Sequence, residues 1–254
     1  MPRYYWDIQQ GTDAWNEIRL GKLTASSFHT FLGNSQTKKD MLWEIVAERM
    51  FKDSDKDEYS SYAMERGKAL EAEARRLYQA IKETKVKECG FVSMDPPYDS
   101  FVGCSPDGLI DEDGGLEIKS PLAKNFLQWT RPVDGDRKIV YIKPEYTTQV
   151  QFNLLVTGRK WWDFMYYHPR GGYAIQRIYP DEEYQKKILD ALNESIQFVI
   201  LQTGECNTIE QKDLKCLQNT TMLTEDFSSK TKKRTAKKAP TTKAKSTSTE
   251  KTTD

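Results

Sequence analysis

The sequence predicts an α/β protein whose central mixed β-sheet is flanked by helices. Apolar residues recur with helical spacing through most of residues 13–83, and short apolar runs separated by Pro, Asp and Gly occupy residues 86–119. A helical pattern, two further strand-like runs and a last long helical pattern follow, up to residue 202. This order of helices, strands, helix, strands and helix is typical of a sheet covered by helices.

Four helices are expected before the first strand. Thr12 or Asp13 can cap the first, which ends before Gly21, and the second ends at Gly33. Two longer helices follow, and the polar stretch between them predicts a loop. They are expected at about residues 41–50 and 62–83, with the loop at residues 52–60.

The remaining elements are bounded by turn and cap residues. Pro144 in a first turn and Gly158 after a last turn bracket one helix, and Asp181 and Gly204 delimit the final long helix. Strand-like runs cover residues 86–93, 101–105, 108–111, 116–119, 161–167 and 173–179, and a short helix is expected at residues 125–131.

Charge divides the chain into an acidic body and a basic end. The 38 Lys and Arg balance the 38 Asp and Glu, but residues 228–254 contain nine Lys or Arg and two Asp or Glu. That end carries +7, which leaves −7 on residues 1–227. We expect one folded domain at residues 1–205, an extension of undecided structure at 206–227, and a disordered Lys/Thr-rich tail at 228–254. The tail can add nonspecific affinity for nucleic acid, or serve as a solubilising or partner-binding extension.

Cysteine spacing and the N-terminus predict a cytoplasmic protein. The four cysteines show no CxxC pair, so neither a zinc site nor a disulfide framework is expected. The first residues lack a basic segment followed by an apolar stretch, and no run of about 18 apolar residues occurs. No secretion signal and no membrane span are therefore expected.

Two carboxylates and a lysine lie on neighbouring strand-like runs. Asp107 precedes one run, and Glu117 and Lys119 belong to the next, beyond a Gly-rich turn. The strand period places Glu117 and Lys119 on one face and turns Ile118 toward the core. Two carboxylates that repel each other favour a divalent cation between them, and a lysine can orient or deprotonate water or steady the transition-state charge. The grouping predicts metal-dependent phosphodiester hydrolysis. An ordinary hairpin with an exposed Glu–Lys pair is the alternative.

Other polar side chains are candidates for the same site. Glu71 lies on the helix before the strands and can supply a third carboxylate. Gln149 and Gln151 lie among apolar neighbours, so each needs a partner, either in an active site or in a plain internal hydrogen bond. Three other glutamates compete with Glu71 for the role: Glu65, Glu73 and Glu83.

Arg19 and Ser26 flank a glycine near the start of the chain. A guanidinium, a hydroxyl and helix N-terminal N–H groups together can bind a phosphate. A helix cap beside a surface arginine explains the same residues without any ligand.

Five segments follow one another along the chain in an informative order. They are Ala14-Trp15 with Arg19-Leu20-Gly21 and Leu23-Thr24-Ala25-Ser26, then Gly67-Lys68-Ala69-Leu70-Glu71 with Ala74-Arg75, then Ser105-Pro106-Asp107-Gly108-Leu109, then Leu116-Glu117-Ile118-Lys119-Ser120-Pro121, and Gln149-Val150-Gln151 with Val156-Thr157. In this order they resemble the phage lambda exonuclease family, also called YqaJ-type viral recombinases, of the PD-(D/E)xK nuclease superfamily. The resemblance covers roughly residues 6–200, and five weak motifs in order are together specific.

The resemblance implies a restriction-endonuclease-like core and a Mg²⁺-dependent exonuclease that digests linear double-stranded DNA from 5′ to 3′. Its products would be 3′ single-stranded overhangs for phage-type homologous recombination. Two Mg²⁺ ions per site are implied, with Mn²⁺ as a substitute. The implied metal ligands are Asp107, Glu117, the Ile118 carbonyl and Glu71. The resemblance makes Lys119 the catalytic lysine and Gln149 the catalytic glutamine, and it assigns the terminal 5′-phosphate to Arg19 and Ser26.

Family members can form a trimeric ring around DNA and work with a single-strand annealing protein, so a homotrimer and such a phage partner are also implied. For a phage-encoded protein, the compartment is the cytoplasm of the bacterial host. Two alternatives to the exonuclease stay open. One is a structure-specific or repair endonuclease of the same fold, and the other is a catalytically inactive DNA-binding accessory protein of recombination.

Overall fold

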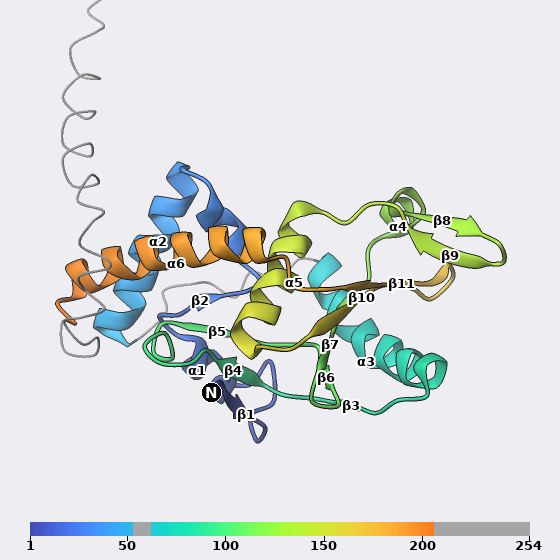
Figure 1. The fold of residues 1–254 in the computed structure, drawn as a ribbon, viewed down its shortest axis with the longest axis horizontal. Helices are drawn as coiled ribbons and strands as arrows, with labels where there is room; N and C mark the ends of the chain where they lie inside the picture. The colour runs from blue at the N-terminus through green and yellow to red at the C-terminus, as the bar shows by residue number, and fades with distance from the viewer. Residues whose placement is uncertain (53–61, 206–254) are drawn as a thin grey trace, which may run out of the picture. The chain divides into compact units, whose positions relative to one another are not determined.

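A computed structural model describes residues 1–52 and 62–205, which form two main β-sheets joined by helices (Figure 1). In the smaller sheet only the β2–β5 pair is parallel. In the larger sheet β7 and β10 are parallel and the other pairs are antiparallel. The smaller sheet has the order β1 (Arg3–Tyr5), β4 (Phe91–Ser93), β5 (Val102–Cys104) and β2 (Leu23–Thr24). The larger has the order β11 (Gly172–Ile178), β10 (Trp161–His168), β7 (Gly114–Lys119), β6 (Gly108–Ile110) and β3 (Val86–Lys87).

Helices cover these sheets, and a separate hairpin lies beside one of them. The helices are α1 (Asp13–Arg19), η1 (Phe28–Leu32, a 3₁₀ helix), α2 (Gln36–Phe51), α3 (Tyr62–Lys82), α4 (Ala123–Trp129), α5 (Pro144–Thr157) and α6 (Glu182–Thr203). Strands β8 (Thr130–Val133) and β9 (Asp136–Ile139) form the hairpin after α4. No helix in the described ranges is long and apolar enough to cross a membrane.

Helix α3 packs on one face of the larger sheet because its apolar positions follow the helical period. Ala74 and Tyr78 are buried there against Ile118 and Met165. The burial of Ile118 confirms that this side chain turns toward the core. Since Glu117 and Lys119 alternate with it along β7, they occupy the opposite face.

Helix α5 lies on that opposite face and packs against strands of both sheets (Figure 1). It is buried nearly all round, which explains why its polar residues need partners inside the protein. Pro144 in its first turn and the left-handed Gly158 after its last turn end it where the sequence predicts. Helix α6 likewise begins after its cap Asp181 and ends before Gly204, as predicted.

The predicted order of elements is confirmed, with differences at the shortest ones. The second expected helix is the 3₁₀ helix η1, which ends just before Gly33, and the short strand β2 precedes it. The run at residues 86–93 divides into β3 and β4, which belong to different sheets. Strand β1 and the β8–β9 hairpin were not expected. The loop at residues 52–60, apart from residue 52, the extension from residue 206 and the basic tail lie outside the described residues.

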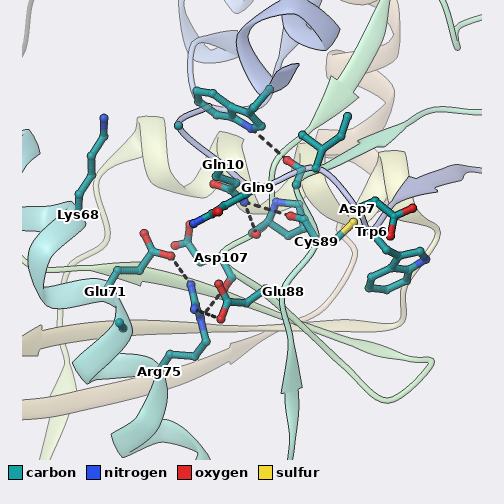
Figure 2. A pocket seen from close by; sticks show the side chains of 16 residues that line it. Trp6, Asp7, Gln9, Gln10, Lys68, Glu71, Arg75, Glu88, Cys89 and Asp107 are labelled. Atoms are coloured by element: carbon teal, nitrogen blue, oxygen red, sulfur yellow. Dashed lines mark hydrogen bonds and ion pairs between the residues drawn. The ribbon is translucent and has the colours of Figure 1, made fainter. Parts of the chain in front are cut away.

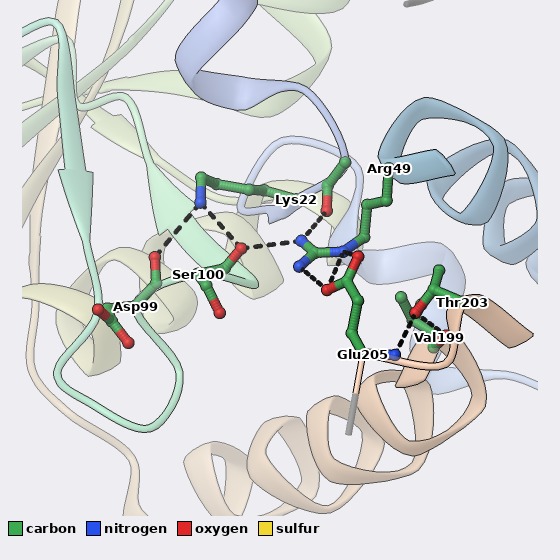
Figure 3. Close-up of polar contacts among 8 residues, drawn as sticks. Lys22, Arg49, Asp99, Ser100, Val199, Thr203 and Glu205 are labelled. Carbon is green, nitrogen blue, oxygen red and sulfur yellow. Dashed lines mark hydrogen bonds and ion pairs between the residues drawn. The ribbon is translucent and has the colours of Figure 1, made fainter. Parts of the chain in front are cut away.

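A cluster of polar contacts fixes the turn between α1 and β2 (Figure 3). Arg49 of α2 donates to the carbonyls of Gly21 and Ser100 and pairs with Glu205 just after α6. Glu48 accepts from the N–H of Gly21, at 2.8 Å. Helices α2 and α6 therefore hold the turn that follows Arg19.

Candidate active site

The hairpin of β6 and β7 places Asp107 opposite Glu117. Gly108 pairs with Leu116 in the antiparallel register, so the next position outward sets Asp107 across from Glu117. Asp107 lies where the chain leaves β5 of the smaller sheet and enters β6 of the larger one. The two carboxylates therefore meet at the junction of the sheets.

Glu117 is a fully buried carboxylate with two partners. Its Oε1 forms an ion pair with Lys119 Nζ at 2.6 Å, and its Oε2 accepts from Asn153 Nδ2 of α5 at 3.2 Å. The Lys119 ammonium also lies 5.3 Å from the ring centre of Tyr146, on the same helix. Helix α5 thus contributes an amide and an aromatic face to the carboxylate–lysine pair.

Asp107 is held through both its side chain and its main chain. Its Oδ2 accepts from the N–H of Ile118 at 2.6 Å, and its carbonyl accepts from Arg75 Nε at 2.9 Å. The first contact comes from β7 and the second from α3. Because both elements are packed in the core, the direction of this carboxylate is set by the fold.

Glu71 reaches the same region from α3. It pairs with Arg75 one turn later, and Arg75 also pairs with Glu88 at 2.6 Å (Figure 2). Its rival Glu73 has another contact, because it accepts from the Tyr167 hydroxyl at 2.6 Å. The charges of Asp107 and Lys119 both act on Glu71.

Burial and mutual repulsion raise the pKa values of these acids. Burial, and then the Asp107 charge, raise the pKa of Glu117 to about 8 and that of Glu71 to about 7. Burial also raises the pKa of Asp107, although Lys119 and the Ile118 N–H oppose this. For Lys119 burial favours the neutral amine, but the Glu117 and Asp107 carboxylates outweigh it and raise the pKa. The lysine is therefore an ammonium at neutral pH.

The residues fit a hard divalent cation such as Mg²⁺. Within the described ranges, no three His, Cys, Asp or Glu side chains form a ready-made metal cluster. Mg²⁺ nevertheless keeps several waters and needs only one or two carboxylates from a protein. Burial raises the pKa values of Asp107, Glu117 and Glu71, and the Asp107 charge adds to the rise at Glu117 and Glu71. A cation bound between the acids would remove that repulsion.

Arg19 lies near this centre, in a small polar cluster. Its guanidinium stacks on the Trp15 ring at 4.0 Å and donates to Ser105 Oγ at 3.2 Å. Trp15 Nε1 donates to the same hydroxyl at 2.9 Å. Burial lowers the pKa of Arg19 to about 10, so it stays charged at neutral pH. Ser26 is exposed, and no contact joins it to Arg19.

The polar residues of α5 have separate tasks. Gln151 accepts from the N–H of Asp181 and donates to the Tyr179 carbonyl, so it anchors the start of α6. Gln149 is 8% exposed and lies one turn before Asn153, on the same side of the helix. Among the described residues no hydrogen bond joins Gln149 to the acids, whereas Asn153 is hydrogen-bonded to Glu117.

Four residues of this region had no predicted role: Asn153, Tyr146, Arg75 and Ser105. Asn153 was detectable in principle, because it follows Gln149 by four residues on a helix already expected to face the site. Arg75 and Ser105 belong to the recognised segments, but their partners are distant in sequence. Only the fold could reveal those contacts.

A cavity of about 490 Å³ opens beside Asp107 and Glu71 (Figure 2). It lies where the chain crosses between the two sheets at Cys89–Gly90 and again at Pro106–Asp107. The segment between β1 and α1 forms another wall, and Gln10 fastens it by donating to the carbonyls of Cys89 and Pro106.

Comparison with known proteins places the chain among nucleases. The family model described as YqaJ-like viral recombinase domain matches residues 14–160. No curated protein matches the chain.

Solved structures resemble most of the chain. The crystal structure of an alkaline exonuclease (LHK-Exo) from Laribacter hongkongensis is 27% identical with a TM-score of 0.66, over 81% of this chain and 100% of that one. The structure of LHK-Exo in complex with dAMP gives 28% identity and the same TM-score and coverage. A phage related exonuclease from Haemophilus somnus 129PT is 12% identical with a TM-score of 0.53, over 72% of this chain and 96% of that one, and shows the fold alone. The core is thus of the restriction-endonuclease-like type, as predicted.

Proposed function

Because this chain belongs to the YqaJ-like viral recombinase family, we propose that it is a Mg²⁺-dependent exonuclease that digests linear double-stranded DNA from 5′ to 3′. The chain is a phage-type exonuclease, a hydrolase acting on DNA. The metal, the polarity and the 3′ overhangs for homologous recombination are the proposed parts. The observation that carries the proposal is the meeting of Asp107, Glu117 and Lys119 at one strand end, with Glu71 of α3 close enough for its charge to interact with Asp107 and Lys119.

Each of these residues has a distinct proposed role. Asp107, Glu117 and Glu71 would hold the metal, with the Ile118 carbonyl beside them, and Mn²⁺ is a proposed substitute. Two Mg²⁺ ions bound there would acidify water and neutralise the phosphoryl oxygens. Lys119, held as an ammonium against Glu117, orients the water and stabilises negative charge that develops on the phosphate.

Asn153 and Tyr146 act through the pair of Glu117 and Lys119. Asn153 fixes one carboxylate oxygen of Glu117, which leaves the other directed at Lys119. The Tyr146 ring limits the space open to the Lys119 ammonium. Gln149, on the same helix and one turn away, is proposed to contact the substrate or a metal-bound water.

Arg19 and Ser105 form the proposed binding site for the terminal 5′-phosphate, the 5′-phosphate site. A guanidinium and a hydroxyl already in contact, 3.2 Å apart, offer the charge and the donors that a phosphate needs. Ser26 is proposed to join them only when DNA is bound. Ser105 and Asp107 are two residues apart, so this 5′-phosphate site lies beside the proposed cleavage centre.

The decisive experiment uses linear duplex DNA labelled separately at each 5′ and each 3′ end, with and without Mg²⁺. We expect early loss of the 5′ label, only with the metal, and accumulation of 3′ overhangs. The Asp107→Ala and Lys119→Ala variants should be folded and inactive. Cleavage of closed circular duplex would instead indicate an endonuclease. DNA binding that is insensitive to chelators, with no cleavage under Mg²⁺ or Mn²⁺, would indicate an inactive accessory protein.

The assembly and the partner are proposed from the family resemblance. We expect a homotrimer around double-stranded DNA and cooperation with a phage single-strand annealing protein in the bacterial cytoplasm. Sedimentation of the purified full chain tests the first expectation, and a monomer at working concentration would contradict it. Co-purification with the annealing protein of the same phage tests the second.

A further inference from the structure

The cavity beside the acids also borders the proposed 5′-phosphate site of Arg19 and Ser105. Asp107 and Glu71 line one side, and Trp15 lines another. The Arg19 guanidinium stacks on the Trp15 ring, and the indole N–H of Trp15 donates to Ser105. The 5′-phosphate site therefore adjoins the cavity wall. If one phosphate lies at Arg19 and the next at the metal-binding acids, the nucleoside between them is the part of the substrate that lies beside the cavity.

The charges of the side chains that line the cavity favour a neutral part of the terminal nucleotide over its phosphate. Four side chains of the lining are acidic, Asp7, Glu71, Glu88 and Asp107, and two are cations, Lys68 and Arg75. Arg75 is already engaged by Glu71 and Glu88. A phosphate deep in this cavity would therefore meet a net negative charge. A nucleobase is neutral, and its flat faces and polar edges suit a cavity of about 490 Å³, within the range of roughly 300–1,000 Å³ that is usual for small-ligand sites.

Trp6 supplies an aromatic surface at the far end of this cavity. It lines the cavity and is 48% exposed. Its other face stacks on Tyr4, with ring centres 5.4 Å apart and planes 10° from parallel. Tyr4 belongs to β1 and pairs with Val92 of β4, so the platform is anchored in the smaller sheet. The exposed amide of Gln9, on the same wall, can hydrogen-bond the edge of a base.

We propose that this cavity is a base-binding subsite, in which the base of the 5′-terminal nucleotide stacks on Trp6. The inference rests on the proposed function and adds to it the place of the nucleotide that is released. Stacking on an aromatic ring accepts every base, because each has a π face, so the subsite suits an enzyme that digests DNA of any sequence.

The test compares two small ligands that differ only by the base. Binding of dAMP and of 2-deoxyribose 5-phosphate to the full chain is measured by calorimetry in Mg²⁺ buffer. Stacking contributes about 1–3 kcal/mol per base, so we expect dAMP to bind at least 5-fold more tightly, and dTMP to behave similarly. Trp6→Ala should bring the ratio of the two affinities close to one, and Trp6→Phe should restore most of it.

Trp43 provides the matched control. It is 53% exposed, lies on α2 and contacts Phe198, away from the cavity. Trp43→Ala should leave the affinity ratio unchanged. Equal affinity of the wild-type protein for the two ligands would overturn the subsite, and this outcome needs no variant to fold. A wild-type protein that prefers dAMP yet fails to digest DNA would instead contradict the proposed function and leave the subsite standing.

Discussion

At the scale of single residues, the site is defined by acids that the protein compensates only in part. Glu117 is fully buried, yet its partners are one ammonium and one neutral amide. Glu71 is ion-paired with Arg75, which it shares with Glu88. An excess of carboxylates over cations in a buried place costs stability, and it is the arrangement expected where a metal completes the charge balance.

This imbalance predicts how the stability depends on pH. The folded-state pKa values of Glu117 and Glu71, about 8 and about 7, exceed the ordinary value of 4.5. The folded state therefore holds protons that the unfolded chain releases, and the free energy of unfolding of the metal-free protein falls as pH rises from about 4.5 to about 8. Because Mg²⁺ binds the deprotonated acids, the increase in Tm that it causes should grow from pH 6 to pH 9.

Thermal unfolding at several pH values, with Mg²⁺ or with a chelator, measures this difference. Glu117→Gln removes one titrating acid and should flatten the curve of the metal-free protein. A Mg²⁺ effect of the same size at pH 6 and pH 9 would contradict the assignment of the acids.

Asn153 should be needed for the orientation of Glu117. Asn153→Ala removes the hydrogen bond at 3.2 Å to a buried carboxylate. Hydrogen bonds to charged groups contribute about 1.5–3 kcal/mol, so kcat should fall about 10-fold or more. Steady-state digestion at saturating DNA measures it, and the Mg²⁺ concentration for half-maximal rate should rise as well. A purely structural role would lower Tm without changing that Mg²⁺ requirement.

Arg19 should distinguish DNA ends by their phosphate. Its guanidinium donates to Ser105 and stays charged at neutral pH. Arg19→Ala should therefore reduce the preference for 5′-phosphorylated over unphosphorylated ends by about 10-fold, while overall DNA binding changes less. The two kinds of end are compared in single-turnover digestion. An equal loss of digestion rate on both kinds of end would argue against a phosphate-binding site at this position.

At the scale of elements, the position of β7 depends on two tryptophan rings that pack directly on its glycines. A Cβ on Gly115 would lie 2.3 Å from the Trp162 ring, and one on Gly114 would lie 2.1 Å from the Trp161 ring. The strand that bears Glu117 and Lys119 therefore lies close against β10, with which it pairs in parallel.

A side chain at Gly115 should disturb both fold and site. Gly115→Ala overpacks a buried strand, which typically costs about 1–3 kcal/mol, and it displaces β7 two residues before Glu117. Gly67→Ala in α3 is the control: a Cβ there meets nothing within 4 Å, and alanine should stabilise the helix by about 0.5–1 kcal/mol. Urea unfolding of both variants measures the two opposite changes. Equal stability of the Gly115 variant and the wild type would refute the close packing.

The elements that the sequence predicts best have signals within a few residues of their ends. Pro144, Gly158, Asp181 and Gly204 mark α5 and α6 because caps and breakers act locally. Strands β1 and β2 have three and two residues and pair with strands nearly 80 or more residues away, so no local pattern reveals them. The β8–β9 hairpin has a local signal in Asp134-Gly135, both with positive φ. Pro132, within β8, is an opposing local signal, because proline cannot donate a hydrogen bond to a neighbouring strand.

The residues of the candidate site likewise fall into those that local sequence signals predict and those that only the fold brings together. Asp107, Glu117 and Lys119 were detectable because a hairpin joins residues only ten or so apart. The contact of Asn153 with Glu117 spans 36 residues, and that of Arg19 with Ser105 spans 86. Such contacts depend on how α5 and α1 pack on the sheets, which periodicity does not specify.

At the scale of the whole molecule, the acidic body and the basic end should make DNA binding depend on the tail. Residues 1–227 carry −7 and residues 228–254 carry +7. Deleting 228–254 removes nine cations, so affinity for duplex DNA at low salt should fall, and the slope of log K against log salt should become shallower. Fluorescence anisotropy at several salt concentrations measures both quantities. An unchanged slope would favour a solubilising or partner-binding role for the tail.

The two hydrogen bonds that hold Asp107 also determine which substitution is suited to crystallising the protein with uncleaved DNA. An alanine at this position would leave the Ile118 N–H without the acceptor it has at 2.6 Å. Asp107→Asn keeps a carbonyl oxygen for that N–H, leaves the main-chain contact with Arg75 intact, and removes one negative charge from the proposed cleavage centre. The asparagine variant is therefore the better choice for crystallising an uncleaved DNA complex, because we expect it to stop the proposed reaction while it preserves the local structure.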